Sequence, residues 1–184
     1  MYAHAEGNNN LANGMSSHVE GYNNKAYNNA AHAEGMDTVA EGLAAHAEGM
    51  GTTASTKDVG NAPGAHAEGI NTKAINLATH AEGQSTTASG ANSHAEGQGT
   101  TASGDQSHAE GSGTTASGAY SHAGGYGTIA SHEAQTAIGK YNKDVDSLFS
   151  VGNGEYDEAT KQPVRRDAFR VERDGGIVFL KNKQ

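Results

Sequence analysis

The sequence predicts an all-β protein, a parallel β-solenoid or β-roll built from 14-residue coils. Three observations indicate this class. A histidine recurs every fourteen residues through most of the chain, and small residues hold fixed positions around it. Farther along each unit, fixed and variable positions alternate with a period of two, as in a strand with one buried face. Such units describe stacked coils, none of which is stable alone.

The composition fits a thin, repetitive interior and argues against an ordinary globular core. Glycine contributes 26 of the 184 residues, tryptophan is absent, and aromatic residues make up 5%. Large apolar side chains are therefore too few to fill a thick core. Disordered chains share this composition, but the strict repeat argues against disorder.

One interval breaks the repeat. Successive histidines are fourteen residues apart except His46 and His66, which are twenty apart. The additional residues fall at 56–64, where glycine and proline predict a loop that bulges from one coil. We therefore expect residues 1–142 to form the roll, with a loop insertion at 56–64, and residues 143–184 to form a small β-rich cap or connector.

Each unit is expected to contain two short strands. In the second strand of the unit at 93–106, Thr100 and Ala102 occupy fixed positions while their neighbours vary from unit to unit. Alternation along a strand then places Thr100 and Ala102 inward.

The first strand of the same unit covers residues 93–97. Ser93, Ala95 and Gly97 are small, and we place all three in a narrow interior. The glycine recurs in all nine units, which also predicts a turn that needs positive φ or a close backbone approach. His94 and Glu96 must then point outward.

The outward histidines and glutamates are the candidate functional residues. On a solvated face their identity would drift, yet the histidine holds in nine of nine units and the glutamate in eight. We therefore expect this face to pack on an equally periodic partner, the simplest being the same face of another copy. Ile138 stands at the glutamate position of the tenth coil, as an interface would accept. The predicted interchain positions are His4, Glu6, His18, Glu20, His32, Glu34, His46, Glu48, His66, Glu68, His80, Glu82, His94, Glu96, His108, Glu110, His122 and Ile138.

The repeat resembles the head repeats of trimeric autotransporter adhesins, the YadA-like family, whose motif reads roughly S-V-A-I-G-x-x-S-x-A-x-G. Residues 135–139, Gln-Thr-Ala-Ile-Gly, are close to that apolar form, and the nine preceding units are similar to a polar variant with His for Val and Glu for Ile. The likeness covers about residues 3–142. It implies a left-handed parallel β-roll in which three chains surround one axis with their first strands inward.

The polar variant also resembles repeats of phage tail, neck or fibre proteins, as do the later segments 137–142 and 148–154. This likeness implies a structural, homotrimeric fibre segment of a virion appendage that takes part in attachment to a host surface. The alternative is the head of an adhesin on a bacterial cell surface. In either setting the expected partners are further copies of the chain and a receptor on the host, a protein or a glycan.

The last forty residues follow a different pattern. Residues 148–151, 168–173 and 177–180 alternate like strands. We expect Phe149, Phe169 and Phe179 to form a small core, shared between chains, that closes the open end of the roll. The polar stretch 155–166 is predicted to be a mobile loop.

The repeated residues could also serve a chemical function instead of a structural one. A histidine and a glutamate two residues apart can ligate zinc or nickel, so a metal-binding solenoid is the rival of another class. Adjacent residues on a flat strand do not form a nucleophile-base pair, and no unit differs as an active site would, so we expect no enzyme and no cofactor. The turns lack the aspartates of calcium-binding solenoids, and the threonine pairs do not make an ice-binding array.

Charge and cysteine content narrow the partners. A formal net charge of −9, with no basic run before the last thirty residues, gives no footprint for nucleic acid or an anionic membrane. The absence of cysteine excludes disulfides and thiolate metal sites.

Overall fold

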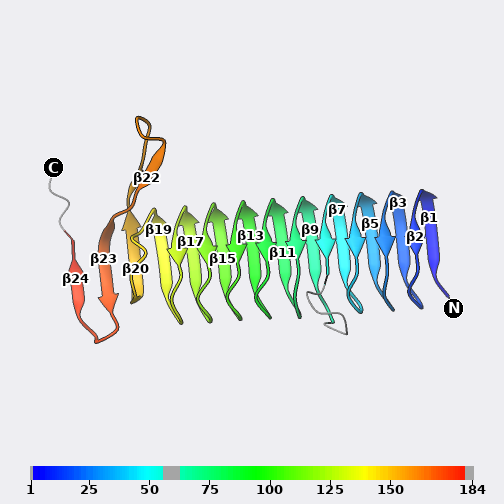
Figure 1. Ribbon diagram of the computed structural model, residues 1–184, viewed down its shortest axis with the longest axis horizontal. Coiled ribbons are helices and arrows are strands. Elements are labelled where there is room, and N and C mark those ends of the chain that lie inside the picture. The colour runs from blue at the N-terminus through cyan, green and yellow to red at the C-terminus, as the bar shows by residue number, and fades with distance from the viewer. Residues whose placement is uncertain (1, 56–62, 181–184) are drawn as a thin grey trace.

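The computed structural model describes residues 2–55 and 63–180. Within these residues every regular element is a strand. Coils of about fourteen residues stack into a parallel β-solenoid, and the first and last described strands lie at opposite ends of the resulting rod (Figure 1). The predicted fold class is confirmed at this level. No helix in the described residues is long and apolar enough to cross a membrane.

The first sheet contains the strands that begin at the repeated histidines. It has thirteen strands, and its solenoid part runs in the order β1-β3-β5-β7-β9-β11-β13-β15-β17-β19. Their bounds are β1 His4–Asn8, β3 His18–Tyr22, β5 His32–Met36, β7 His46–Met50, β9 His66–Ile70, β11 His80–Gln84, β13 His94–Gln98, β15 His108–Ser112, β17 His122–Tyr126 and β19 Thr136–Lys140.

The second sheet lies opposite the first and contains nine two-residue strands. Their bounds are β2 Leu11–Ala12, β4 Lys25–Ala26, β6 Val39–Ala40, β8 Thr53–Ala54, β10 Lys73–Ala74, β12 Thr87–Ala88, β14 Thr101–Ala102, β16 Thr115–Ala116 and β18 Ile129–Ala130.

Parallel pairing holds every unit in the same register. His94 is opposite His80 on one side and His108 on the other. Each position of the repeat therefore forms a straight column along the rod, one strand spacing of about 4.8 Å apart. The register survives the insertion, because His46 is opposite His66. Of the predicted loop at 56–64, residues 56–62 lie outside the described residues.

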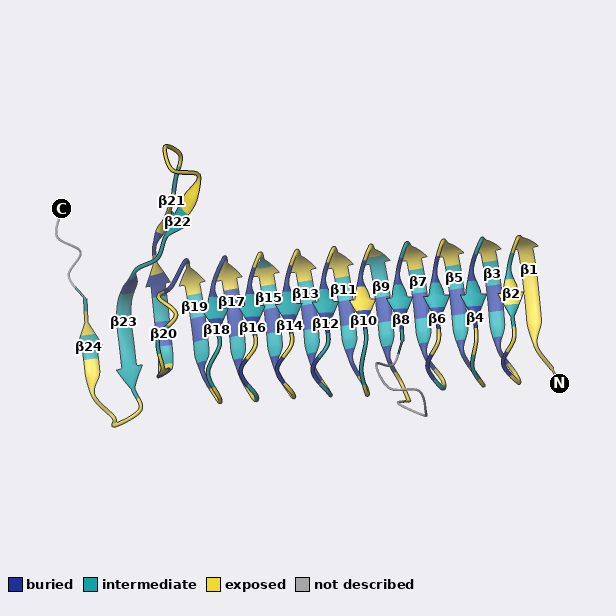
Figure 2. Ribbon diagram, viewed as in Figure 1, coloured by how far each residue is buried: buried dark blue, intermediate teal, exposed yellow. Residues whose placement is uncertain are grey.

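The interior is narrow and is filled by small side chains, as predicted. Ala95, Thr100 and Ala102 are completely buried, and Ser93 is nearly so. The alanine columns form one continuous cluster along the rod. Figure 2 shows the buried segments at matching heights in successive strands.

The prediction that Gly97 faces this interior is wrong. Gly97 is exposed at the turn that leaves the first strand. Its φ is +100°, and a Cβ atom built on it would lie 2.1 Å from the carbonyl oxygen of Gly111. The column of glycines is therefore set by the turn and by the close approach of the next coil.

Beyond residue 142 the first sheet continues. Strand β20 (Ser147–Asn153) pairs in parallel with β19, then β23 (Asp167–Glu172) and β24 (Ile177–Phe179) follow as antiparallel strands. The three C-terminal strands predicted from alternation are confirmed.

The predicted mobile loop at 155–166 is wrong. Strands β21 (Glu155–Asp157) and β22 (Gln162–Val164) form an antiparallel hairpin that projects from the side of the rod (Figure 1). Arg165 anchors its base, because Nη1 donates to the carbonyl oxygen of Gly127 at 2.7 Å. The polar composition concealed the hairpin, because its strands bury little apolar surface.

Candidate functional site

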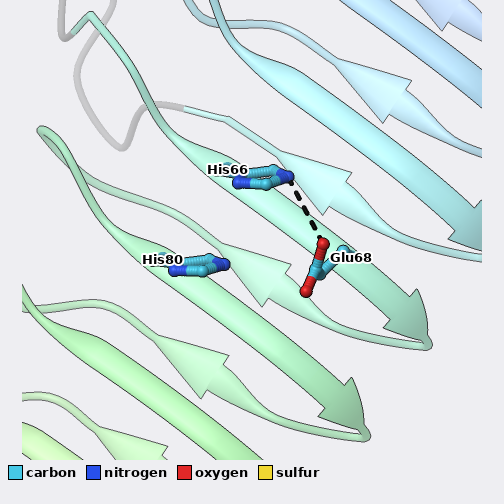
Figure 3. Close-up of side chains that lie close together, drawn as sticks. All are labelled: His66, Glu68 and His80. Atoms are coloured by element: carbon cyan, nitrogen blue, oxygen red, sulfur yellow. Dashed lines mark ion pairs between the residues drawn. The ribbon is translucent and has the colours of Figure 1, made fainter.

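The nine repeated histidines form one stack on the outer face of the first sheet. Consecutive rings are nearly parallel, with centroids 4.6 to 5.1 Å apart from His4 to His122. Figure 3 shows two of them, His66 and His80, on adjacent strands with Glu68 beside them. The outward orientation predicted for the histidine and glutamate columns follows directly from the burial of the alanine between them.

Each glutamate lies beside the histidine stack. In the first five coils a histidine faces the glutamate of its own coil, with Nε2 to Oε2 distances of 3.5 to 3.9 Å. In the later coils it faces the preceding coil: His94 with Glu82 at 3.3 Å, His108 with Glu96 at 3.7 Å, and His122 with Glu110 at 3.2 Å.

Because the pairing changes between coils, one histidine of the stack has no glutamate partner among the described residues. Glu68 pairs with His66, and Glu82 pairs with His94. Among the described residues, His80 consequently has no acidic group within ion-pair distance. One ring nitrogen each of His66 and His80 and one carboxylate oxygen of Glu68 nevertheless lie within 4.8 Å of one another (Figure 3).

The ring nitrogens of this stack are poorly satisfied within one chain. The Nε2 atoms of six histidines are buried and have no hydrogen-bond partner among the described residues; these are His32, His46, His66, His80, His94 and His108. Buried polar atoms without partners destabilise a fold by roughly 1–3 kcal/mol each. A regular row of them indicates a surface that another molecule or an ion completes.

The stack favours neutral imidazoles. Burial lowers the pKa of His46, His80 and His108, and the positive charge that neighbouring histidines would carry lowers it further. The hydrogen-bonding nitrogens are therefore available as acceptors or donors according to tautomer.

The carboxyl groups of neighbouring glutamates shift one another's pKa. A side-chain hydrogen bond with Glu68 raises the pKa of Glu48 to about 7, and the pKa of Glu82 is raised by the same neighbour. Conversely, hydrogen bonds from Glu82 lower the pKa of Glu68 and Glu96. The direction of the pKa shift thus alternates from Glu48 through Glu68 and Glu82 to Glu96.

Toward the C-terminus both columns become apolar. The histidine column passes from His122 through Thr136, Phe149 and Val171 to Ile177. The glutamate column continues through Ile138, Val151 and Phe169 to Phe179. This apolar end patch, defined by Ile138, Phe149, Val151, Phe169, Val171, Ile177 and Phe179, is continuous with the His/Glu face.

The three phenylalanines are together, as predicted, but on this face of the sheet. The ring centroids of Phe149 and Phe169 are 6.1 Å apart, and those of Phe169 and Phe179 are 5.3 Å apart. Phe179 is nevertheless 77% exposed and Ile177 is 62% exposed. An exposed apolar patch of this kind marks an interaction surface.

Four groups of side chains have the donors needed for a metal ion. Three of them combine two glutamates with one histidine, whereas the group of His66, Glu68 and His80 combines two histidines with one glutamate; the three are Glu34-His46-Glu48, Glu82-His94-Glu96 and Glu96-His108-Glu110. In each group the ligand atoms lie within 4.8 Å of one another.

All eighteen predicted interchain positions lie on one face of one sheet, although no contact with a second chain tests their role. That set does not include six positions of the apolar end patch: Phe149, Val151, Phe169, Val171, Ile177 and Phe179. The signal was present, because residues 149–152, Phe-Ser-Val-Gly, repeat the spacing of residues 136–139, Thr-Ala-Ile-Gly.

The fold and this face define a repetitive solenoid with one periodic, incompletely satisfied surface. No protein-family model matches the chain, and no curated protein matches it.

Proposed function

We propose that the chain is a structural protein, an elongated rod that self-associates as a homotrimer through its His/Glu face. One observation carries the proposal: a single continuous face presents unpartnered histidine nitrogens along most of its length and exposed apolar side chains at its end. A partner must offer polar groups that repeat at every strand spacing, opposite the histidine and glutamate columns. It must also offer apolar side chains opposite the apolar end patch. Another copy of the same chain has that pattern by construction.

The asymmetry of the face also fixes how copies align. Copies that run in the same direction place apolar residues on apolar residues and histidines beside glutamates. Antiparallel copies would place Phe149 and its neighbours on the His/Glu ladder and bury charge against apolar surface, which is costly. Parallel, in-register association is therefore part of the proposal.

The biological setting we propose is a tail or neck appendage of a phage, where such a rod contributes to attachment to the host surface. The likeness of the repeat to the polar variant in phage fibre proteins supports this setting. A rod of stacked coils needs no catalytic group for this role, and attachment would use variable outer positions and the projecting β21–β22 hairpin.

Single cysteines test the alignment, since the chain has none of its own. Val151→Cys and Glu6→Cys lie in the same column, ten strand steps or about 48 Å apart. Mixed under mild oxidation, they should give 151–151 and 6–6 disulfides, while Thr115→Cys on the second sheet should give none. Links between 151 and 6 would show antiparallel copies. A monomeric mass in solution would overturn self-association itself.

A further inference from the structure

We infer that His66, Glu68 and His80 form a binding site for a divalent transition cation, with Zn²⁺ as the representative ion. The inference goes beyond the proposed rod, because all three ligands belong to one chain. The Nε2 atoms of His66 and His80 also lie on the proposed interface, so ion binding and the mass in solution are measured separately.

The site arises where the histidine-glutamate pairing changes direction. Glu68 faces its own His66 at 3.8 Å, while the glutamate of the next coil, Glu82, turns away to His94. His80 is left beside Glu68 with no carboxylate of its own (Figure 3). Two imidazoles and one carboxylate from adjacent strands β9 and β11 thus converge on one point.

The free donor atoms point to a ligand. The Nε2 atoms of His66 and His80 are both buried and lack a hydrogen-bond partner among the described residues. An imidazole nitrogen with an available lone pair is the commonest protein ligand of zinc, and a carboxylate oxygen completes a familiar donor set. A bound cation would satisfy both nitrogens at once.

The geometry is close to what coordination requires. Zinc-nitrogen and zinc-oxygen bonds are about 2.0–2.2 Å, so two ligand atoms on a tetrahedral ion lie about 3.3–3.6 Å apart. The 3.8 Å between His66 and Glu68 exceeds this separation by only a few tenths of an ångström. The outer bound of 4.8 Å for the whole group requires a closure of at most about 1.5 Å. Partly exposed side chains can supply it by rotation.

The donor set also selects the class of cation. Imidazole nitrogen favours Zn²⁺, Ni²⁺ and Co²⁺, whereas Mg²⁺ and Ca²⁺ require mostly oxygen ligands. We therefore expect the site to discriminate between these two classes in the untagged, full-length chain.

Calorimetric titration with Zn²⁺ tests the inference, with Co²⁺ absorption as a report of nitrogen coordination. The wild-type chain should bind one Zn²⁺ per chain and melt at a higher temperature with the ion present. His80→Gln and Glu68→Gln should weaken binding by about tenfold or more. The matched controls His18→Gln and Glu20→Gln alter the same two columns outside every candidate group and should bind as the wild type does.

Three results would overturn the site. Zn²⁺ that binds no more tightly than Mg²⁺ or Ca²⁺ would exclude it, as would equal losses in His80→Gln and His18→Gln, which would indicate diffuse binding along the column. A Co²⁺ spectrum unchanged from that of the aqueous ion would exclude nitrogen ligands. Mass measurements on the same samples separate these results from any failure of self-association.

Discussion

Nε2 of His122 lies 3.2 Å from Oε1 of Glu110, a residue of the preceding coil. The coil of His122 has Gly124 where the other histidine-containing coils have glutamate, and Oε1 of Glu110 lies 2.9 Å from the position that a Cβ of residue 124 would take. The side chains of the His/Glu face can therefore differ in pairing from coil to coil, while the backbone beneath them keeps one register.

The backbone requirement predicts that Gly97→Ala destabilises the fold strongly. Alanine would have to adopt a φ near +100° with its Cβ 2.1 Å from the carbonyl oxygen of Gly111. We expect a loss of about 2–5 kcal/mol in the free energy of unfolding, measured by chemical denaturation. Gly124→Ala is the control, because its Cβ would meet side-chain atoms of Glu110 and His122 and no backbone atom, and the loss should stay within about 1 kcal/mol. Equal losses in both variants would contradict this account.

The buried amide of Asn24 is predicted to stabilise the second coil. Its Nδ2 donates to the carbonyl oxygens of Glu20 and Gly35, and its Oδ1 accepts hydrogen bonds from the backbone N–H and hydroxyl of Thr38. Asn24→Ala removes all of these and should lower the free energy of unfolding by about 2–4 kcal/mol. The exposed Asn13→Ala should change it by less than about 0.5 kcal/mol. A loss for Asn24→Ala as small as that would show that water replaces these bonds.

The histidine stack predicts acid sensitivity. The folded pKa of His46, His80 and His108 is lowered, so the unfolded chain binds more protons as the pH falls through about 6.5. This contribution to stability is complete above that pH and is lost below it. A variant with all three replaced by glutamine does not lose this contribution. The melting temperature of the wild type should therefore approach that of the variant as the pH falls from 8 to 5. A difference that does not vary with pH would refute the assignment.

Glu48 should behave in the opposite sense. Its folded pKa of about 7 lies above the ordinary 4.5, so its stabilising proton is held at low pH and lost as the pH rises through 7. Glu48→Gln supplies a permanent donor and should raise the melting temperature at pH 8 but not at pH 5. The effect should stay below about 1 kcal/mol, because the side chain is a third exposed. Glu96→Gln, where the pKa is lowered, should give no such gain.

An apolar exchange tests the proposed interface. His94→Val and His108→Val, combined with Glu96→Ile and Glu110→Ile, convert two coils into the form seen near the C-terminus, where Ile138 and Val151 share the glutamate column. The assembled mass in solution, measured by light scattering, should not change. If the exchanged chain were monomeric while the wild type was trimeric, the His/Glu pairs themselves would be required for association.

Much of the architecture could be predicted from periodicity alone. The positions of Ser93, Ala95, Thr100 and Ala102 in the interior follow from alternation and small size, and all four are buried. Gly97 shows where that reasoning fails, since small size fits both a narrow core and a tight turn. Only φ distinguishes the two.

The positions that form the histidine and glutamate columns could be predicted from the sequence, but the pairing of the side chains within them could not. The outward direction of the histidines follows from the buried alanine beside them. The partner of each histidine does not, because own-coil and preceding-coil glutamates are at similar distances. The apolar end patch was harder to predict, because Thr136 and Phe149 are thirteen and not fourteen residues apart. In addition, strands β23 and β24 pair antiparallel, so the repeat no longer applies to them.

The column register has a consequence for how such a rod can vary between related genes. Because each position pairs with its equivalent in the next coil, removing or duplicating one complete unit rejoins matching surfaces and leaves every other contact intact. The length of the rod can thus change in increments of one strand spacing, about 4.8 Å. A partial unit is tolerated only where the register is kept, as between His46 and His66; elsewhere it would set alanine against histidine.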